Sequence, residues 1–301
     1  MLPTQIDDDA FDALQADPAV WLPVLRQLAD AHGGGPLQPG TGGSVLVALL
    51  GSDRVIKLYP PFLRGHFAYE RAVLPLLAGR LALPTPALLA DGAHQGWPYL
   101  VMGQLAGTPL TAAWPGLAEA DKCALLRTLG ALAAQVHALP VPASLRPLAP
   151  AWPDFIARQR QQCAGRQQRT GLPAHLLAQL GAFLQGPLPE GPAVLLTGEY
   201  TPMNLLVQGT RLSGMFDFGD GLLGPPAYDW LGPLCFLAAG QPARCAAWLQ
   251  GVGADWDADV RQRLLRLLLL HRYSCLRAQI ALPGWQQAPS FEALAELLWG
   301  N

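Results

Sequence analysis

The chain is poor in charge, and neither sign is in excess. Charged residues make up 14% of its 301 residues, and 20 Lys and Arg against 22 Asp and Glu give a formal net charge of −2. No segment forms a basic stripe, so we expect neither a nucleic-acid partner nor binding to an anionic membrane surface. Hydrophobic residues reach 51%, which allows a large buried core and argues against disorder.

Long apolar runs are missing as well. The most apolar run, residues 264–270, is interrupted by Arg266 and is much shorter than the roughly 20 residues that a membrane-spanning helix needs. The first 12 residues are acidic and lack an apolar core, so we expect no secretion signal. These features favour a cytoplasmic protein with no membrane partner.

Cysteine is scarce and unpatterned. The five cysteines are odd in number and include no Cys-x-x-Cys pair, which fits neither a disulfide framework nor a zinc site. They are most simply reduced thiols of a cytosolic protein. The sequence also lacks an internal repeat and a linker, because its 29 prolines and 32 glycines are spread along the whole chain.

The first third of the chain alternates helical and strand patterns. We expect a helix from about 7 to 32, strands at 45–50 and 54–59, a helix at 67–78, and strands at 87–91 and 99–102. The order helix, hairpin, helix, hairpin suits a small sheet with one helix packed on it.

The rest of the chain is dominated by longer helical patterns. The clearest are residues 118–138, 153–166, 174–184 and 257–282, with a short β insert at 194–196 and 204–216. The fold class that follows is α+β, with a small strand-rich lobe over 1–103 and a larger helical lobe over 104–301.

Three features of the first lobe form an ordered set. Gly42, Gly43 and Ser44 lie in a turn before a strand, where small residues let backbone N–H groups approach phosphates. Lys57 lies in the returning strand; alone it is most simply a solvated lysine, but Glu70 on the next helix offers it a carboxylate partner. We predict that the turn and Lys57 bind nucleotide phosphates and that Glu70 fixes the lysine.

A second set lies in the β insert of the helical lobe. Glu199 and Asn204 are five residues apart, and Asp217 opens Asp-Phe-Gly after a strand. A carboxylate can orient or accept a hydroxyl proton, while an amide and a second carboxylate can hold magnesium against phosphates. Polar turns around a hairpin would explain any one of these residues but not the whole series. We therefore predict Glu199 as the catalytic residue and Asn204 and Asp217 as metal ligands.

These motifs resemble those of the aminoglycoside phosphotransferase/choline kinase-like family, relatives of the protein kinases. That family reads His-Gly-Asp-x-His-x-x-Asn, then Ile-Asp-Phe/Trp, then Gly-Asp-Pro-x-x-Asp. The matching segments here are residues 197–204, 216–218 and 224–229, with further likeness at 100–110 and 129–137. The resemblance is good from about 36 to 236.

The resemblance implies a two-lobed protein-kinase-like fold, ATP or GTP and Mg²⁺ as cofactors, and a small-molecule acceptor whose hydroxyl is phosphorylated. It further implies that Lys57 holds the α- and β-phosphates and that backbone groups of Gln104 and Leu105 meet the adenine. Asp229 would brace the catalytic loop through backbone N–H groups.

Four positions depart from the family pattern. Thr197 and Thr201 stand where the family has histidines, Glu199 stands where it has the catalytic aspartate, and Pro225 replaces a later aspartate. Glutamate keeps the charge but adds a methylene. Three functions therefore stay open: an active or slowed phosphotransferase, a pseudokinase-like nucleotide-binding module that acts through a protein partner, and a nucleotidyl transferase.

The acceptor is not fixed by the sequence. Asp255, Asp257 and Asp259 could attract a cationic acceptor, but acidic residues also favour a helix N-terminus. Trp248, Trp256 and Trp285 could form an aromatic cage for a quaternary amine, or they could simply pack in the core. His137 and His271 are expected to be packing or capping residues rather than metal ligands.

Overall fold

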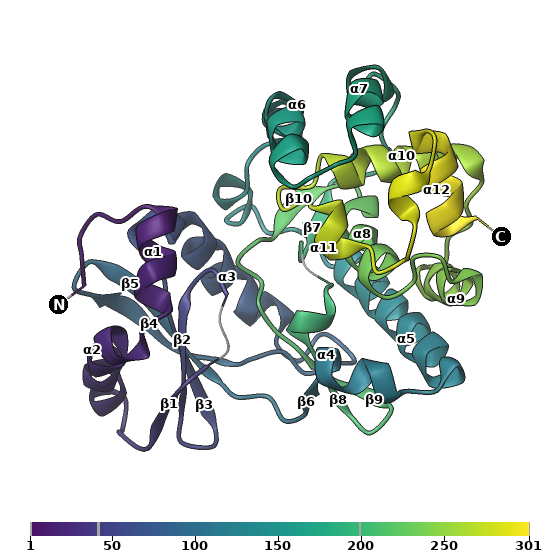
Figure 1. Ribbon diagram of the computed structural model, residues 1–301. Helices are drawn as coiled ribbons and strands as arrows, with labels where there is room; N and C mark the ends of the chain where they lie inside the picture. The colour runs from purple at the N-terminus through teal and green to yellow at the C-terminus, as the bar shows by residue number, and fades with distance from the viewer. Residues whose placement is uncertain (1, 41–42, 199, 301) are drawn as a thin grey trace. The chain divides into compact units, whose positions relative to one another are not determined.

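The chain forms two compact units. Figure 1 shows the computed structural model, which describes residues 2–40, 43–198 and 200–300. The first unit comprises Met1–Gly107 and Ser213–Asp220, and the second comprises Thr108–Leu212 and Gly221–Asn301. The short segment Ser213–Asp220 thus leaves the second unit and joins the first.

The first unit is built on a five-stranded antiparallel sheet in the order β1-β2-β3-β5-β4. Its strands are β1 (Leu37–Pro39), β2 (Leu46–Leu50), β3 (Arg54–Leu58), β4 (Leu88–His94) and β5 (Trp97–Gly103). Its helices are α1 (Asp8–Gln15), α2 (Pro18–Ala31), the 3-10 turn η1 (Pro61–Leu63) and α3 (Arg64–Leu77).

Burial alternates along β2 and shows which face of the sheet packs against the core. Leu46, Ala48 and Leu50 are fully buried, as expected for a strand whose successive side chains point to opposite faces. They join a core cluster with Leu25 of α2 and Ile56 of β3, so helix α2 is packed against the sheet by apolar contacts. In β3, Lys57 is paired between Val47 of β2 and Leu100 of β5.

The single helix expected over residues 7–32 is two helices, which corrects the sequence prediction. The side chain of Asp17 accepts a hydrogen bond from the N–H of Ala19 at 3.1 Å, and Pro18 occupies the first position of α2. An aspartate cap followed by proline is a strong signal for the start of a helix. The apolar periodicity continues across this point, so periodicity alone predicted one helix.

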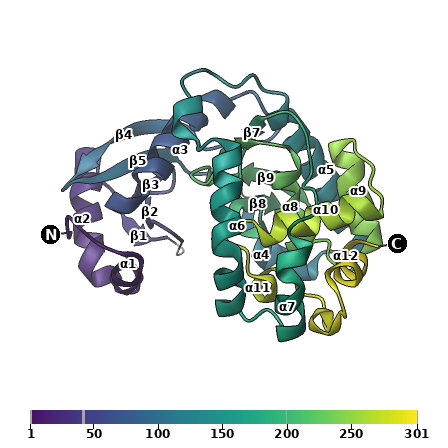
Figure 2. The same ribbon diagram turned by 90° about the horizontal axis from the view of Figure 1, so that it is seen from above.

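The second unit is mainly helical. Its helices are α4 (Leu110–Ala113), α5 (Glu119–His137), α6 (Trp152–Arg169), α7 (Ala174–Phe183), α8 (Ala227–Phe236), α9 (Pro242–Val252), α10 (Ala258–Leu269), α11 (Leu276–Gln279) and α12 (Phe291–Trp299). Its 3-10 turns are η2 (Trp114–Gly116), η3 (Arg146–Leu148), η4 (Pro202–Asn204) and η5 (Trp285–Gln287). Helices α6 and α7 lie side by side (Figure 1, Figure 2).

Short strands support the loops of this unit. They are β6 (Thr108–Pro109), β7 (Val194–Leu196), β8 (Leu205–Gln208), β9 (Arg211–Met215) and β10 (Leu222–Gly224). Strand β7 pairs with β10, and the other three form a sheet in the order β6-β8-β9. The β insert expected from the sequence is therefore present, with 204–216 divided into a hairpin. The last residues of β9, Ser213–Met215, already belong to the first unit.

The helix expected over 257–282 ends at Leu269, a second correction. The Leu269 carbonyl accepts hydrogen bonds from Cys163 Sγ at 3.2 Å and from Gln167 Nε2 at 3.3 Å, both on α6. Side chains of α6 thus bond to the carbonyl that would accept a backbone hydrogen bond if α10 continued. Because these side chains are distant in sequence, the local periodicity does not predict where α10 ends. Among the described helices, none is both long and apolar enough to cross a membrane.

Candidate active site

The first unit brings Lys57, Glu70 and Asp217 together. The Lys57 ammonium donates to Glu70 Oε1 at 3.0 Å and Oε2 at 2.8 Å, and to Asp217 Oδ1 at 2.8 Å. The Lys57 and Glu70 side chains are buried, whereas 42% of the Asp217 side chain is exposed. The strand β3, the helix α3 and the segment after β9 each contribute one member.

Two further donors hold the Glu70 carboxylate. The Tyr59 hydroxyl donates to Glu70 Oε2, and the backbone N–H of Phe218 donates to Oε1 at 3.2 Å. A buried carboxylate is costly unless its lone pairs are satisfied, so these bonds make the buried charge tolerable. Sequence reasoning missed Tyr59. Its signal was its place two residues after Lys57, since alternate residues of an extended strand point to the same face.

The electrostatics of this group keep it ionised. Burial alone would lower the pKa of Lys57, but the two carboxylates outweigh it and raise that pKa above the usual value. Burial would likewise raise the pKa of Asp217, whereas the Lys57 ammonium, its hydrogen bond and the Gly219 backbone lower it. Burial and then Glu70 raise the pKa of Tyr59, so its hydroxyl remains a donor.

Asp217 has an unusual backbone. Its φ of 69° lies in the left-handed region, which costs energy for a residue with a Cβ and is most frequent at functional positions. Close by, His66 Nδ1 lies 3.3 Å from Asp220 Oδ1, a second link between α3 and this segment. The conformation of the Asp-Phe-Gly segment is thus fixed by side chains from β3 and α3.

The second unit carries the loop between β7 and η4. Asp229 of α8 accepts hydrogen bonds from the N–H groups of Thr197 at 3.1 Å and Gly198 at 2.8 Å, and from His137 Nε2 at 2.9 Å. This is the brace that the family resemblance implies for Asp229. Asn204 lies in η4 and is buried, with 6% of its surface exposed.

The remaining predicted site residues lie in the turn before β2, in the loop after β7 and in the segment after β5. Gly42 and Glu199 lie outside the described residues. Gly43 and Ser44 are exposed just before β2, and the carbonyl of Gly43 accepts a hydrogen bond from Gln15 Nε2 at 2.7 Å.

The predicted adenine-binding segment follows β5. Gln104 is exposed and its backbone N–H donates to the Asp53 carbonyl at 2.7 Å. Leu105 is half-buried beside Gly214, at the end of the sheet. Their contact with a nucleotide stays a prediction.

The donor set fits magnesium only in combination with phosphates. Within the described residues no group of three or more His, Cys, Asp or Glu side chains could hold a metal ion. Magnesium is commonly bound through one or two carboxylates together with waters and substrate phosphates. The partly exposed carboxylate of Asp217 and the amide oxygen of Asn204 are hard oxygen donors of the required kind.

The acidic cluster before α10 has structural partners. Asp257 caps the helix by accepting from the Val260 N–H at 2.9 Å, and Asp259 pairs with Arg263 at 2.7 Å. Trp248 and Trp285 are fully buried, so neither offers a ring to a ligand. These contacts favour the structural interpretation of both sequence features.

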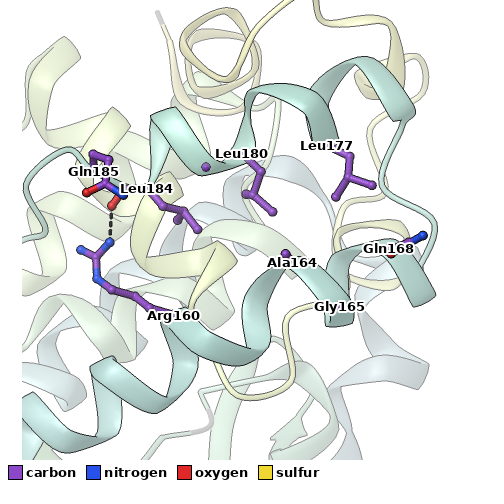
Figure 3. Close-up of a pocket in the computed structure, with 9 residues that line it drawn as sticks. Arg160, Ala164, Gly165, Gln168, Leu177, Leu180, Leu184 and Gln185 are labelled. Atoms are coloured by element: carbon purple, nitrogen blue, oxygen red, sulfur yellow. Dashed lines mark hydrogen bonds between the residues drawn. The ribbon is translucent and has the colours of Figure 1, made fainter.

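A cavity of about 430 Å³ lies between α6 and α7 (Figure 3). Leu177 and Leu180 of α7 and Leu184 just after it line the cavity from one side, and Ala164 and Gly165 of α6 from the other. None of the predicted site residues that the structure describes is among its lining residues.

The fold is α+β and protein-kinase-like, as the sequence predicts. A structure of the streptomycin–ATP–APH(2")-IIa ternary complex has a TM-score of 0.63 at 17% identity, covering 89% of this chain and 91% of that chain. The GDP complex of wild-type aminoglycoside 2'-phosphotransferase-IIIa has a TM-score of 0.68 at 19% identity, covering 93% and 98%. Apo macrolide 2'-phosphotransferase MphH from Brachybacterium faecium has a TM-score of 0.60 at 23% identity, covering 91% and 97%.

The family follows from the sequence of most of the chain. A model of the phosphotransferase enzyme family matches residues 36–267. The chain belongs to this family, and the resemblance drawn from its motifs is confirmed.

Proposed function

We propose that this protein is a phosphotransferase that uses ATP or GTP with Mg²⁺ to phosphorylate a hydroxyl of a small molecule. The observation that carries the proposal is the bonding of Lys57 to both Glu70 and Asp217 at 2.8–3.0 Å. This arrangement places a fixed cation beside an accessible carboxylate, which is what phosphoryl transfer requires of a protein.

Each of these residues, together with Asn204 of the second unit, has a distinct role in the proposal. Lys57 would clamp nucleotide phosphates, with Glu70 and Tyr59 holding its ammonium in place. Asp217 and Asn204 would hold the magnesium ion. The bound nucleotide would supply the phosphoryl group, and the metal would neutralise charge that develops on it.

Glu199 would orient the acceptor hydroxyl or accept its proton. The extra methylene moves its carboxylate outward, and a shift near 1 Å can cost about 10²-fold in rate. Positioning and electrostatic stabilisation nevertheless lower the barrier to phosphoryl transfer more than the base does, and the residues proposed for both are present. An active or slowed enzyme is therefore favoured over an inert one.

The acceptor is proposed only as a class. Similar solved structures include complexes with streptomycin, kanamycin and gentamicin, and another is a macrolide phosphotransferase. All these compounds are hydroxyl-bearing small molecules, which supports an acceptor of this kind here. We further propose a cytoplasmic protein with no nucleic-acid or membrane partner, since the chain has a net charge of −2 and no basic stripe.

The test of nucleotide binding is a thermal-shift titration with ATP and with GTP, each with and without Mg²⁺. A ligand at 100 times its Kd stabilises the native state by about 2.7 kcal/mol, enough for a clear rise in Tm. In the wild type we expect a rise in Tm that depends on magnesium. In Asp217→Ala we expect magnesium to have no effect on the Tm measured with nucleotide. No rise with either nucleotide would contradict the proposal. A rise without turnover of any acceptor would favour the nucleotide-binding module that acts through a protein partner.

A further inference from the structure

The Lys57 ammonium places all of its donors on carboxylate oxygens. It donates to Glu70 Oε1 at 3.0 Å, to Glu70 Oε2 at 2.8 Å and to Asp217 Oδ1 at 2.8 Å. A protonated lysine has three N–H groups, so these contacts use each of them. A phosphate oxygen that binds Lys57 must therefore displace one of these carboxylate oxygens.

Glu70 is the partner that Lys57 cannot leave at low cost. Only 1% of the surface of Glu70 is exposed. Besides Lys57, its Oε1 accepts the backbone N–H of Phe218 at 3.2 Å, and its Oε2 accepts the Tyr59 hydroxyl. These two donors fix the carboxylate in one orientation. If Lys57 moved away, a buried negative charge would be left without its counter-charge, which is strongly unfavourable.

Tyr59 is itself held in place by its surroundings. It is fully buried, and its ring meets that of Phe67 at 66° with the centroids 5.6 Å apart. Its backbone N–H donates to the Pro98 carbonyl at 2.8 Å. The ring centroid also lies 5.8 Å from Lys57 Nζ, within the range of a cation–π interaction. Tyr59 therefore favours the position in which the ammonium stays with Glu70.

Asp217 is the partner that can be exchanged. Its side chain is 42% exposed, so water reaches the carboxylate. It offers Lys57 one oxygen, whereas Glu70 offers two. A partly exposed carboxylate that loses an ion pair is solvated by water, so the loss costs less than it does for a buried one. Of the two carboxylates, Asp217 is therefore the one that a phosphate displaces.

Asp217 obstructs a phosphate in two ways. Its Oδ1 occupies a Lys57 donor that the phosphate needs, and its charge has the same sign as the phosphate. Both obstacles are reduced once Asp217 ligates a divalent cation, because the cation cancels the charge of the carboxylate and competes with Lys57 for its oxygen. The same residue thus opposes nucleotide alone and favours nucleotide together with metal.

We infer that Asp217 opposes nucleotide binding until it ligates a divalent cation, because Lys57 keeps Glu70 and exchanges Asp217 for a phosphate oxygen. This exchange rests on the proposed function and adds to it a reason why nucleotide and metal bind together. It also makes Asp217 more than a metal ligand, since its ion pair with Lys57 sets the affinity for nucleotide without metal.

The test measures binding and needs no turnover. Calorimetric titration with ATP and with GTP, each in EDTA and in Mg²⁺, compares the wild type with Asp217→Asn, which removes the charge and keeps the shape. Without metal, we expect Asp217→Asn to bind nucleotide about tenfold more tightly, the gain expected when Lys57 is free to make one hydrogen bond to a charged group. Magnesium should tighten binding to the wild type and have little effect on the variant.

Asp220→Asn is the matched control. It removes the same charge three residues further along the same segment, where Asp220 Oδ1 lies 3.3 Å from His66 Nδ1. Its affinity for nucleotide without metal should change less than about twofold, because the Lys57 contacts are intact and salt screens the more distant charge. An equal gain in Asp217→Asn and Asp220→Asn would show a general charge effect and overturn the inference.

A second readout follows Lys57 itself. The chain has two lysines, so protein labelled with ¹³C at the lysine ε-carbon gives two NMR signals, and Lys122 of the second unit is the internal control. We expect nucleotide without metal to move the Lys57 signal in Asp217→Asn and to leave Lys122 unchanged. Tighter binding with an unmoved Lys57 signal would overturn the exchange, because lower repulsion alone would then explain the gain.

The outcomes separate this inference from the proposed function. Equal or weaker metal-free binding by Asp217→Asn, beside magnesium-dependent binding by the wild type, would overturn the inference alone. Metal-free binding by Asp217→Asn with a moved Lys57 signal, beside no binding by the wild type in either condition, would support the exchange and contradict the proposed function. Binding by neither protein in any condition would overturn both.

Discussion

Lysine and asparagine are rare in this chain, and their positions are informative at the scale of single residues. The chain has two lysines among its 20 basic residues and two asparagines, one of them at the C-terminus. Arginine, the usual cation here, presents a wide planar fork, whereas an ammonium is a compact charge with three donors. Lys57 uses those donors on three carboxylate oxygens of Glu70 and Asp217. An arginine could not make the same contacts from the same place.

Glu199 gives the first prediction at this scale. Glu199→Gln removes the charge with little change of shape, so turnover should fall about 10²-fold or more while nucleotide binding is retained. Glu199→Asp, which restores the family residue, should keep or raise activity. The assay is steady-state turnover beside a nucleotide titration. Full activity in Glu199→Gln would show that another group accepts the proton.

Tyr59 gives the second prediction. Tyr59→Phe removes the hydroxyl that donates to buried Glu70, so the free energy of unfolding should fall by about 1–3 kcal/mol. Tyr99→Phe is the matched control, because its hydroxyl pairs with the ring of His32, and not with a buried carboxylate, at 3.1 Å in a part-buried place and should cost less than about 1 kcal/mol. Urea denaturation measures both. An equal loss in the two variants would contradict a special role for Tyr59.

At the scale of elements, the crossing of α5 and α9 depends on glycine. A Cβ at Gly130 would lie 2.7 Å from the Trp248 carbonyl oxygen and 2.9 Å from the Val252 nitrogen, both backbone atoms. Gly130→Ala should therefore destabilise the protein by about 1–3 kcal/mol despite the better helix propensity of alanine.

The control for this prediction is Gly181→Ala in α7. A Cβ at Gly181 has no neighbour within 4 Å among the described residues, so this variant should be neutral or stabilising by up to about 1 kcal/mol. Opposite signs in the two denaturation curves would support the close crossing. A neutral Gly130→Ala would show that the two helices can move apart at little cost.

The turn after α10 makes stability depend on pH. His271 has a folded pKa of about 3, below its unfolded value near 6.5, because it is buried and faces Arg272 and Arg166 as well as Tyr228 and Tyr273. Below pH 6.5 the unfolded chain takes up a proton that the folded chain refuses, so this contribution to stability falls as the pH is lowered. Between pH 7 and pH 5 the loss from His271 should be about 2 kcal/mol.

His271→Gln isolates this contribution. Urea denaturation at pH 7 and pH 5 should show a loss about 2 kcal/mol larger in the wild type than in His271→Gln, since the variant lacks the titrating group. Equal losses in the two proteins would mean that His271 is protonated in the folded state.

At the scale of the whole molecule, the sequence predicts elements better than their ends. A continuous apolar run followed by a glycine-containing turn identified the hairpin of β2 and β3, and helical periodicity identified α3 and α5. The same periodicity ran through the break between α1 and α2, where the Asp17-Pro18 pair was the overlooked local signal. The end of α10 had no local signal, because side chains of α6 determine it.

For the site too, the sequence predicted some residues and missed others. Residue type and order pointed to Lys57, Glu70 and Asp217, and the structure brings these three together. Tyr59 escaped notice because a tyrosine at a strand end is unremarkable without its partner.

The central claim is that Lys57 and Asp217 support magnesium-dependent phosphoryl transfer to a small-molecule hydroxyl. The most direct measurement is the release of nucleoside diphosphate from ATP and from GTP in the presence of a panel of hydroxyl-bearing acceptors, with the phosphorylated product identified by mass spectrometry. We expect an acceptor-dependent, magnesium-dependent product with wild-type protein and a loss of at least 10²-fold in Asp217→Ala. Product formation that is independent of magnesium, or equal in Asp217→Ala, would contradict the account.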